Sequence, residues 1–139
     1  MKLLRNLLFV SCVCFLTNSC VKKIVEEATN DLFVSIMTTG KWKVTSYMEE
    51  TTDLTASFMG WETQFFSNNT SISIKGTSTV NGTWSGGLAT NKMTVNTVSP
   101  IAPLEKLIGT WDIVNGTFTT AKFSQYRNGV NLKLELTKL

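Results

Sequence analysis

The chain has 139 residues, 42% of them hydrophobic and 17% charged, and it contains no histidine. This composition suits one folded domain with a core and excludes an extensively disordered chain. Two of the thirteen Lys and Arg residues, Lys2 and Arg5, lie in a leader that we expect to be removed, which leaves eleven basic against ten acidic residues. That balance gives no indication of nucleic-acid binding.

The first nineteen residues resemble the signal peptide of a bacterial lipoprotein. A basic start, MKLLRN, precedes an apolar run of about ten residues that is too short to span a bilayer. The segment ends in LTNSC, and lipoproteins are cleaved before such a cysteine, which is then acylated. Thr17 and Asn18 depart from the usual pattern, whereas Ser19 fits it. The resemblance implies that residues 1–19 are a signal peptide and that Cys20 is lipidated, for example with palmitate.

A protein anchored in this way is held on a membrane of the bacterial cell envelope, and we expect the outer membrane. The alternative is an ordinary secretory peptide cut at a nearby site. That cleavage would leave a soluble periplasmic protein.

Residues 20–39 are expected to form the lipidated N-terminus and a short helical linker. The apolar residues of this segment recur every four positions, at Ile24, Ala28, Leu32 and Ile36. We favour a helix that leads from the anchor into the domain over one that lies on the membrane surface. The reason is that its mixed charges do not form the strongly basic face that anionic lipids select.

After Gly40 the hydrophobic period changes to two, which predicts β-strands. Turns are indicated by Gly86-Gly87 and by three Asn-Gly pairs, at residues 81–82, 115–116 and 128–129, since Asn and Gly tolerate positive φ angles. Eight strands are therefore predicted, over residues 41–48, 61–67, 70–75, 83–85, 92–98, 110–114, 118–126 and 131–138. A polar connection over residues 49–60 and a proline-containing insert over residues 99–109 interrupt the series of hairpins.

Residues 40–139 are predicted to form an eight-stranded up-and-down antiparallel β-barrel. Strands joined by hairpins pair with each other, and closing such a sheet removes both of its edges. A sandwich of two four-stranded sheets is the alternative.

The order of motifs carries a family resemblance. GKWKVTSY, WETQFF, VNGTWS, NKMTVN, the proline-containing insert, TWDIV and LKLELTKL follow one another between Gly40 and Leu139. This order resembles the small lipocalin-like domains of Bacteroidetes-type lipoproteins. In lipocalins the tryptophan of a first-strand Gly-x-Trp packs across the closed end of the barrel beneath an arginine from the last strand, which implies that role for Trp42. The last strand here offers Lys133 and Lys138 but no arginine, so the resemblance implies architecture and no particular ligand.

Period-two phasing predicts which side chains point into the barrel. An eight-stranded barrel is just wide enough to be filled by its side chains or to hold one small ligand. The predicted lining, which forms either a core or a ligand site, consists of Trp42, Val44, Phe65, Ile72, Ile74, Trp84, Met93, Val95, Trp111, Ile113, Phe123, Leu132, Leu134 and Leu136. Smaller inward residues that could leave space are Ser46, Thr63, Thr97 and Ala121.

The sequence indicates a protein that is not an enzyme. All three cysteines lie within the first twenty residues, and the absence of histidine closes imidazole-dependent catalysis and the usual zinc sites. Glu49 and Glu50 are adjacent and would diverge on an extended chain. We expect no metal and no cofactor. The expected function is a membrane-anchored lipoprotein that binds a hydrophobic small molecule or lipid in its barrel; the alternative is a structural or interaction lipoprotein with a filled barrel.

Overall fold

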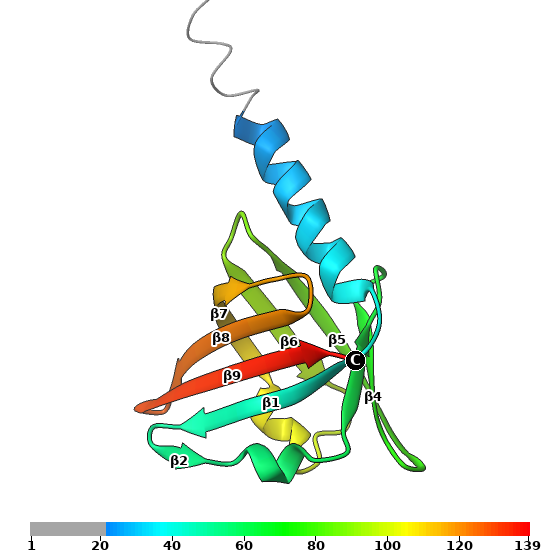
Figure 1. Cartoon of the computed structure of the whole chain (residues 1–139), viewed down its shortest axis with the longest axis vertical. Helices are drawn as coiled ribbons and strands as arrows, with labels where there is room; N and C mark the ends of the chain where they lie inside the picture. The colour runs from blue at the N-terminus through cyan, green and yellow to red at the C-terminus, as the bar shows by residue number, and fades with distance from the viewer. Residues whose placement is uncertain (1–21) are drawn as a thin grey trace, which may run out of the picture.

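A computed structural model describes residues 22–139 and contains a closed antiparallel β-barrel with a helix at one end (Figure 1). The strands follow the order β2-β1-β3-β4-β5-β6-β7-β8-β9, and β1 also pairs with β9. Apart from the two-residue β2, eight strands form the barrel, and all neighbours are antiparallel. The predicted up-and-down barrel is confirmed, and the two-sheet sandwich is wrong.

The elements follow one another with short connections. A helix over residues 22–38 comes first. The strands are β1 (Trp42–Glu49), β2 (Thr52–Asp53), β3 (Glu62–Phe65), β4 (Thr70–Lys75), β5 (Ser78–Gly87), β6 (Lys92–Thr97), β7 (Gly109–Gly116), β8 (Thr120–Arg127) and β9 (Val130–Lys138). Two 3-10 helices interrupt them, η1 (Thr55–Phe58) and η2 (Leu104–Leu107).

Two of the predicted turn signals lie inside a strand. β5 continues through Asn81-Gly82 to Gly87, so the turns predicted at Gly82 and at Gly86-Gly87 are wrong. A Cβ on Gly82 would lie 2.3 Å from the carbonyl oxygen of Asn96, and one on Gly87 would lie 2.3 Å from Oδ1 of Asn30. These glycines therefore permit close approach of a neighbouring strand and of the N-terminal helix.

The other two Asn-Gly pairs have different outcomes. Asn115 and Gly116 end β7, and the reversal follows at residues 117–119. Asn128 and Gly129 form the β8–β9 turn as predicted, with φ angles of 54° and 81°. Left-handed backbone at two successive positions is what an Asn-Gly hairpin turn requires.

The phase of two strands differs from the prediction. A β-bulge between Val44 and Ser46 turns Tyr47 into the core with no exposed surface, so Ser46 is not an inward residue. In β4 the buried positions are Ser71 and Ser73, and the predicted inward Ile72 and Ile74 lie on the outer face, half-buried. An alternation of Ile and Ser has a period of two whichever residue points inward. Hydrophobicity alone placed the isoleucines inside the barrel, which is wrong.

The core runs through the barrel from the helix at one end to η2 at the other. Phe33 and Met37 of the helix are buried in the main cluster, together with Trp42 and Trp111. Leu104 of η2 is buried in a smaller adjoining cluster. No helix within residues 22–139 is long and apolar enough to cross a membrane.

Candidate functional site

The barrel interior holds one small cavity with two kinds of lining. Its volume is about 30 Å³. Strands β1 and β9 contribute only apolar side chains, including Trp42 and Leu134. Strand β4 contributes hydroxyls, and β3 and β6 contribute both kinds. A cavity of this size has room for about one or two water molecules, whereas pockets for drug-sized ligands measure roughly 300–1,000 Å³. In this conformation the interior is therefore close to a filled core.

The hydroxyl side of the cavity consists of four residues. Thr63 Oγ1 and Ser73 Oγ lie 2.8 Å apart in a hydrogen bond. Thr97 Oγ1 is buried and has no hydrogen-bond partner among the described residues. Ser71 completes the group. The predictions for Thr63 and Thr97 as slim inward residues agree with this lining, but the sequence did not indicate the two serines.

Some of the predicted inward residues line the cavity, and others are buried in the surrounding core. The cavity is lined by Trp42, Val44, Phe65, Met93, Val95, Leu134 and Leu136. The predicted inward residues that are buried without lining it are Trp84, Trp111, Ile113, Ala121, Phe123 and Leu132. Most side chains that the phasing aimed inward therefore pack on one another, as in a core.

One end of the barrel, which we call the helix end, is closed by the helix over residues 22–38. Trp42 is fully buried, and its Nε1 donates a 2.9 Å hydrogen bond to the carbonyl of Met37. Lys138 Nζ lies 4.9 Å from the centre of the Trp42 ring and donates a 2.9 Å hydrogen bond to the carbonyl of Ile36. The indole and the ammonium thus satisfy two carbonyls that end the helix. Lys138 of the last strand thus stands over the Trp42 ring.

The opposite end, which we call the η2 end, is closed by η2 with the same kind of contact. Trp111 Nε1 donates a 2.8 Å hydrogen bond to the carbonyl of Leu107. Arg127 donates to the carbonyls of Ile108, at 2.8 Å, and Lys106, at 3.3 Å. Side chains from β7 and β8 therefore satisfy three successive carbonyls at the end of η2.

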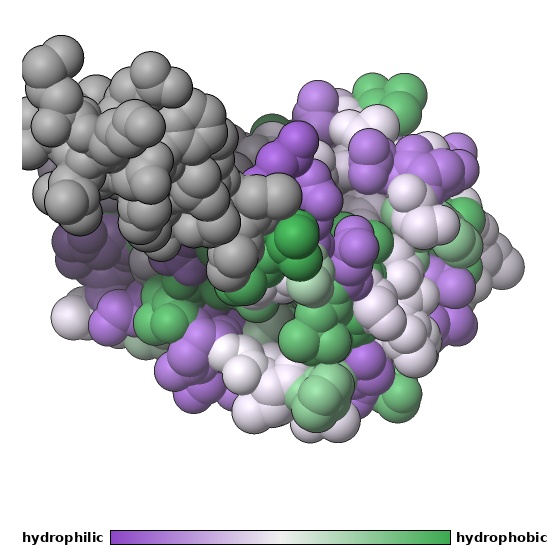
Figure 2. All heavy atoms as spheres, turned by 90° about the horizontal axis from the view of Figure 1, so that it is seen from above, coloured by the Kyte–Doolittle hydropathy of each residue, from purple (hydrophilic) through white to green (hydrophobic). Residues whose placement is uncertain are grey.

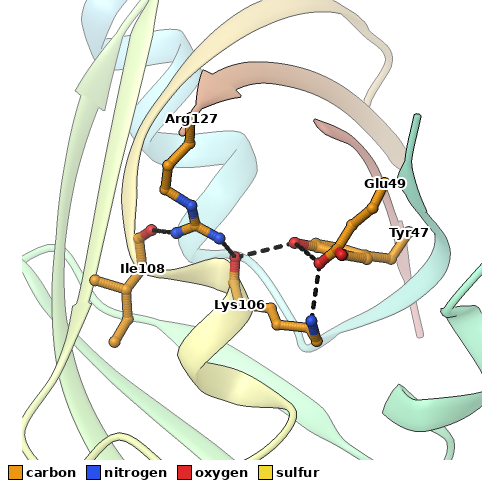
Figure 3. Close-up of polar contacts among 5 residues, drawn as sticks. All are labelled: Tyr47, Glu49, Lys106, Ile108 and Arg127. Atoms are coloured by element: carbon orange, nitrogen blue, oxygen red, sulfur yellow. Dashed lines mark hydrogen bonds and ion pairs between the residues drawn. The ribbon is translucent and has the colours of Figure 1, made fainter. Parts of the chain in front are cut away.

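Tyr47 and Glu49 of β1 extend this network. Tyr47 Oη donates to the carbonyl of Lys106 at 3.3 Å, and Lys106 Nζ lies 2.8 Å from Oε1 of Glu49 (Figure 3). Burial raises the pKa of Tyr47 to about 12, and the Glu49 carboxylate adds to the rise. A phenol with this pKa is neutral at physiological pH and acts as a hydrogen-bond donor.

The seam between β1 and β3 is the least regular part of the barrel. The two strands form a single ladder pair, Trp42 with Thr63. Farther along β1, η1 replaces the missing strand contacts: Thr55 Oγ1 accepts from the backbone N–H of Tyr47 at 2.9 Å. The segment over residues 49–60, predicted as a polar connection, thus seals the side of the barrel.

An open groove of about 430 Å³ runs over this seam on the outside. Three side chains line both the groove and the inner cavity, namely Val44, Phe58 and Trp61. Phe58 and Trp61 are buried. These side chains are therefore the partition between the groove and the interior.

The adjacent carboxylates Glu49 and Glu50 point to different partners. Glu49 pairs with Lys106, while Glu50 accepts from the backbone N–H of Asn131 at 2.6 Å, so the adjacent carboxylates serve separate contacts. No group of three or more potential metal-ligating acidic residues occurs within residues 22–139. Cys20, the predicted lipidation site, lies outside the described residues.

The fold and its interior define the class of protein as a small antiparallel β-barrel closed by a helical segment at each end. No protein-family model matches the sequence, and no curated protein matches it. Among solved structures, the crystal structure of a DUF4847 family protein from Bacteroides vulgatus is similar, with a TM-score of 0.58. The match covers 76% of this chain and 96% of that chain at 11% sequence identity, and at that identity it shows a shared fold alone.

Proposed function

We propose that this chain is a lipocalin-like lipoprotein of the bacterial cell envelope, anchored through Cys20, that acts without catalysis as a structural or interaction module. The observation that carries the proposal is the filled interior: both barrel ends are closed, and the enclosed volume is about 30 Å³. A barrel built in this way offers its outer surface to a partner.

The anchor is supported by the leader and by the LTNSC sequence that ends it. The test is Cys20→Ser in the native host. We expect the wild-type chain to incorporate radioactive fatty acid and to sediment with outer membranes, and the variant to do neither. Retained labelling of the variant would refute the anchor.

The absence of catalysis is supported by residue chemistry. The sequence has no histidine, and burial keeps the Tyr47 phenol neutral with a pKa of about 12. Residues 21–139 contain no cysteine, so they offer no thiolate nucleophile.

The filled barrel is tested by titrating the mature protein with an environment-sensitive fluorescent fatty acid. We expect no saturable rise in fluorescence, and native mass spectrometry should detect no non-covalent adduct. Saturable uptake at one site per barrel would overturn the proposal in favour of the second candidate.

That second candidate is a binding protein for a small hydrophobic molecule or lipid, and the mixed lining of the cavity favours it. The unpaired hydroxyl of Thr97 faces an apolar surface, which suits a ligand with an apolar body and one polar group. The seam beside Phe58 is the only side of the described barrel where two neighbouring strands form a single ladder pair. Such a ligand would require η1 to move outward, so uptake would be slow and would be accelerated by Phe58→Ala.

A further inference from the structure

We propose that the N-terminal helix lies on the surface of the anchoring membrane, with an outer apolar stripe seated in the boundary between lipid headgroups and acyl chains. The stripe consists of Ile24, Val25, Ala28 and Leu32. This inference rests on the proposed anchor at Cys20.

The first observation is that the helix uses a different face to bind the barrel. Phe33 and Met37 are buried against the core, whereas Ile24, Val25 and Leu32 are 60%, 58% and 48% exposed. Of the apolar residues spaced four apart, Ile24, Ala28 and Leu32 are exposed, whereas Ile36 is half-buried against the core. At about 100° per residue, the stripe spans roughly 100° of the circumference, on the side of the helix away from Phe33 and Met37.

The second observation is the placement of charge. Lys22 pairs with Glu26 at 3.8 Å, and Lys23 pairs with Glu27 at 3.9 Å. On the helical wheel these four residues lie outside the stripe, and Asp31 stands at its edge. The stripe itself carries no charge. A helix with one apolar face and a polar remainder is the form that lies in a membrane interface.

The third observation is the distance from the lipid attachment. Cys20 precedes Lys22, the first described helical residue, by two positions, which span at most about 7 Å. Acyl chains at Cys20 therefore bring the start of the stripe to the bilayer. Acyl chains in the bilayer keep the stripe next to the lipid, so its effective concentration at the membrane is high. A stripe that is too small to bind a membrane by itself is therefore sufficient to set the orientation of the helix.

The arrangement of the molecule agrees with this placement. The helix projects beyond the strands (Figure 1), and residues 22–28 are all exposed. Apolar surface is visible among hydrophilic residues at this end of the molecule (Figure 2). When the stripe is in the membrane, the barrel lies on the opposite face of the helix and close to the lipid surface. A helix perpendicular to the membrane would instead hold the barrel away from it. The mixed charges of this segment favoured a linker over a surface helix when the sequence alone was considered, and the exposed apolar stripe reverses that preference. The balanced charge instead makes the seating independent of anionic lipids.

The test uses mature, acylated protein in phosphatidylcholine vesicles, with and without phosphatidylglycerol. An environment-sensitive fluorophore is attached to Val25→Cys, in the stripe, or to Lys23→Cys, at nearly the same height on the other side. Both native side chains are exposed, so the fold tolerates either label. Acylated Cys20 does not react with the label.

We expect the probe at position 25 to shift to shorter wavelength and to be quenched severalfold more by nitroxide-labelled lipid than the probe at position 23, in both lipid compositions. Equal exposure of the two probes to aqueous iodide, in protein that floats with the vesicles, would overturn the surface helix and leave the anchor intact. Protection of position 25 from iodide without lipid quenching would indicate a second copy of the chain and would also overturn it. Failure to float would refute the anchor, and the surface helix with it.

Discussion

The two ends of the barrel are closed by the same chemistry on different elements. At the helix end, Trp42 and Lys138 bind the final carbonyls of a long helix. At the η2 end, Trp111 and Arg127 bind the final carbonyls of a four-residue helix. In each case an indole N–H and a cation satisfy groups that have no partner within their own helix. The comparison teaches that Trp42 and Trp111 each hold a helical segment over one end of the barrel.

The ends differ in what continues beyond the closure. The helix at one end leads to the anchor, whereas η2 is an insert between two paired strands, β6 and β7. The η2 end also has the larger polar network, because Tyr47 and Glu49 join it. We therefore expect the two closures to depend equally on their tryptophans but unequally on their cations.

The largest effects are expected from the tryptophans. Trp42→Ala and Trp111→Ala should each lower the free energy of unfolding by about 3–5 kcal/mol, because both side chains are fully buried. Chemical denaturation followed by circular dichroism measures the loss. Phenylalanine at either position keeps most of the apolar contact and should cost less. A large loss at one end only would show that the two closures are not equivalent.

The next effect is a pH dependence confined to the η2 end. The pKa of Tyr47 is raised to about 12, so the folded state favours the neutral phenol. The contribution of the neutral phenol to the free energy of unfolding is fully present below the unfolded pKa of about 10 and is lost as the pH rises through 12. By linkage the loss approaches roughly 2–3 kcal/mol.

Denaturation midpoints of wild type and Tyr47→Phe, measured between pH 8 and pH 12, test this expectation. The difference between the two proteins should change with pH above pH 10. If the midpoints of the two proteins changed in parallel with pH throughout this range, Tyr47 would not be the source of the loss of stability at alkaline pH.

The cations are expected to differ. Arg127→Met removes two hydrogen bonds to η2 carbonyls and should cost about 1–2 kcal/mol. Lys138→Met removes one hydrogen bond and the contact with the Trp42 ring, and about 1 kcal/mol is expected. Lys138→Arg should be nearly neutral, since a guanidinium can make both contacts. An equal loss for the two methionine variants, measured by urea denaturation, would contradict the expected inequality.

The sequence predicted the closed barrel because hairpin signals and alternation are local, and Asn128-Gly129 forms its turn as expected. Features that depend on neighbouring elements were not predictable. The β-bulge that turns Tyr47 inward breaks the two-residue alternation of β1. Gly82 was predicted to form a turn, but its role is to allow the close approach of β6. Ser71 and Ser73 of the cavity lining were not predicted, because the alternation in β4 was assigned with its isoleucines inward.

The smallest effect concerns the cavity between the two ends. Thr97→Val replaces a buried hydroxyl that has no partner among residues 22–139 with a methyl group, and should raise the free energy of unfolding by about 1 kcal/mol. Thr63→Val is the matched control, because its hydroxyl pairs with Ser73 at 2.8 Å and its loss should destabilise by about 1 kcal/mol. Opposite signs in thermal denaturation are expected if the interior is a core. The opposite outcome is that Thr97→Val destabilises protein purified from its host but does not destabilise delipidated protein. That result would indicate that the Thr97 hydroxyl binds a ligand enclosed between the two barrel ends.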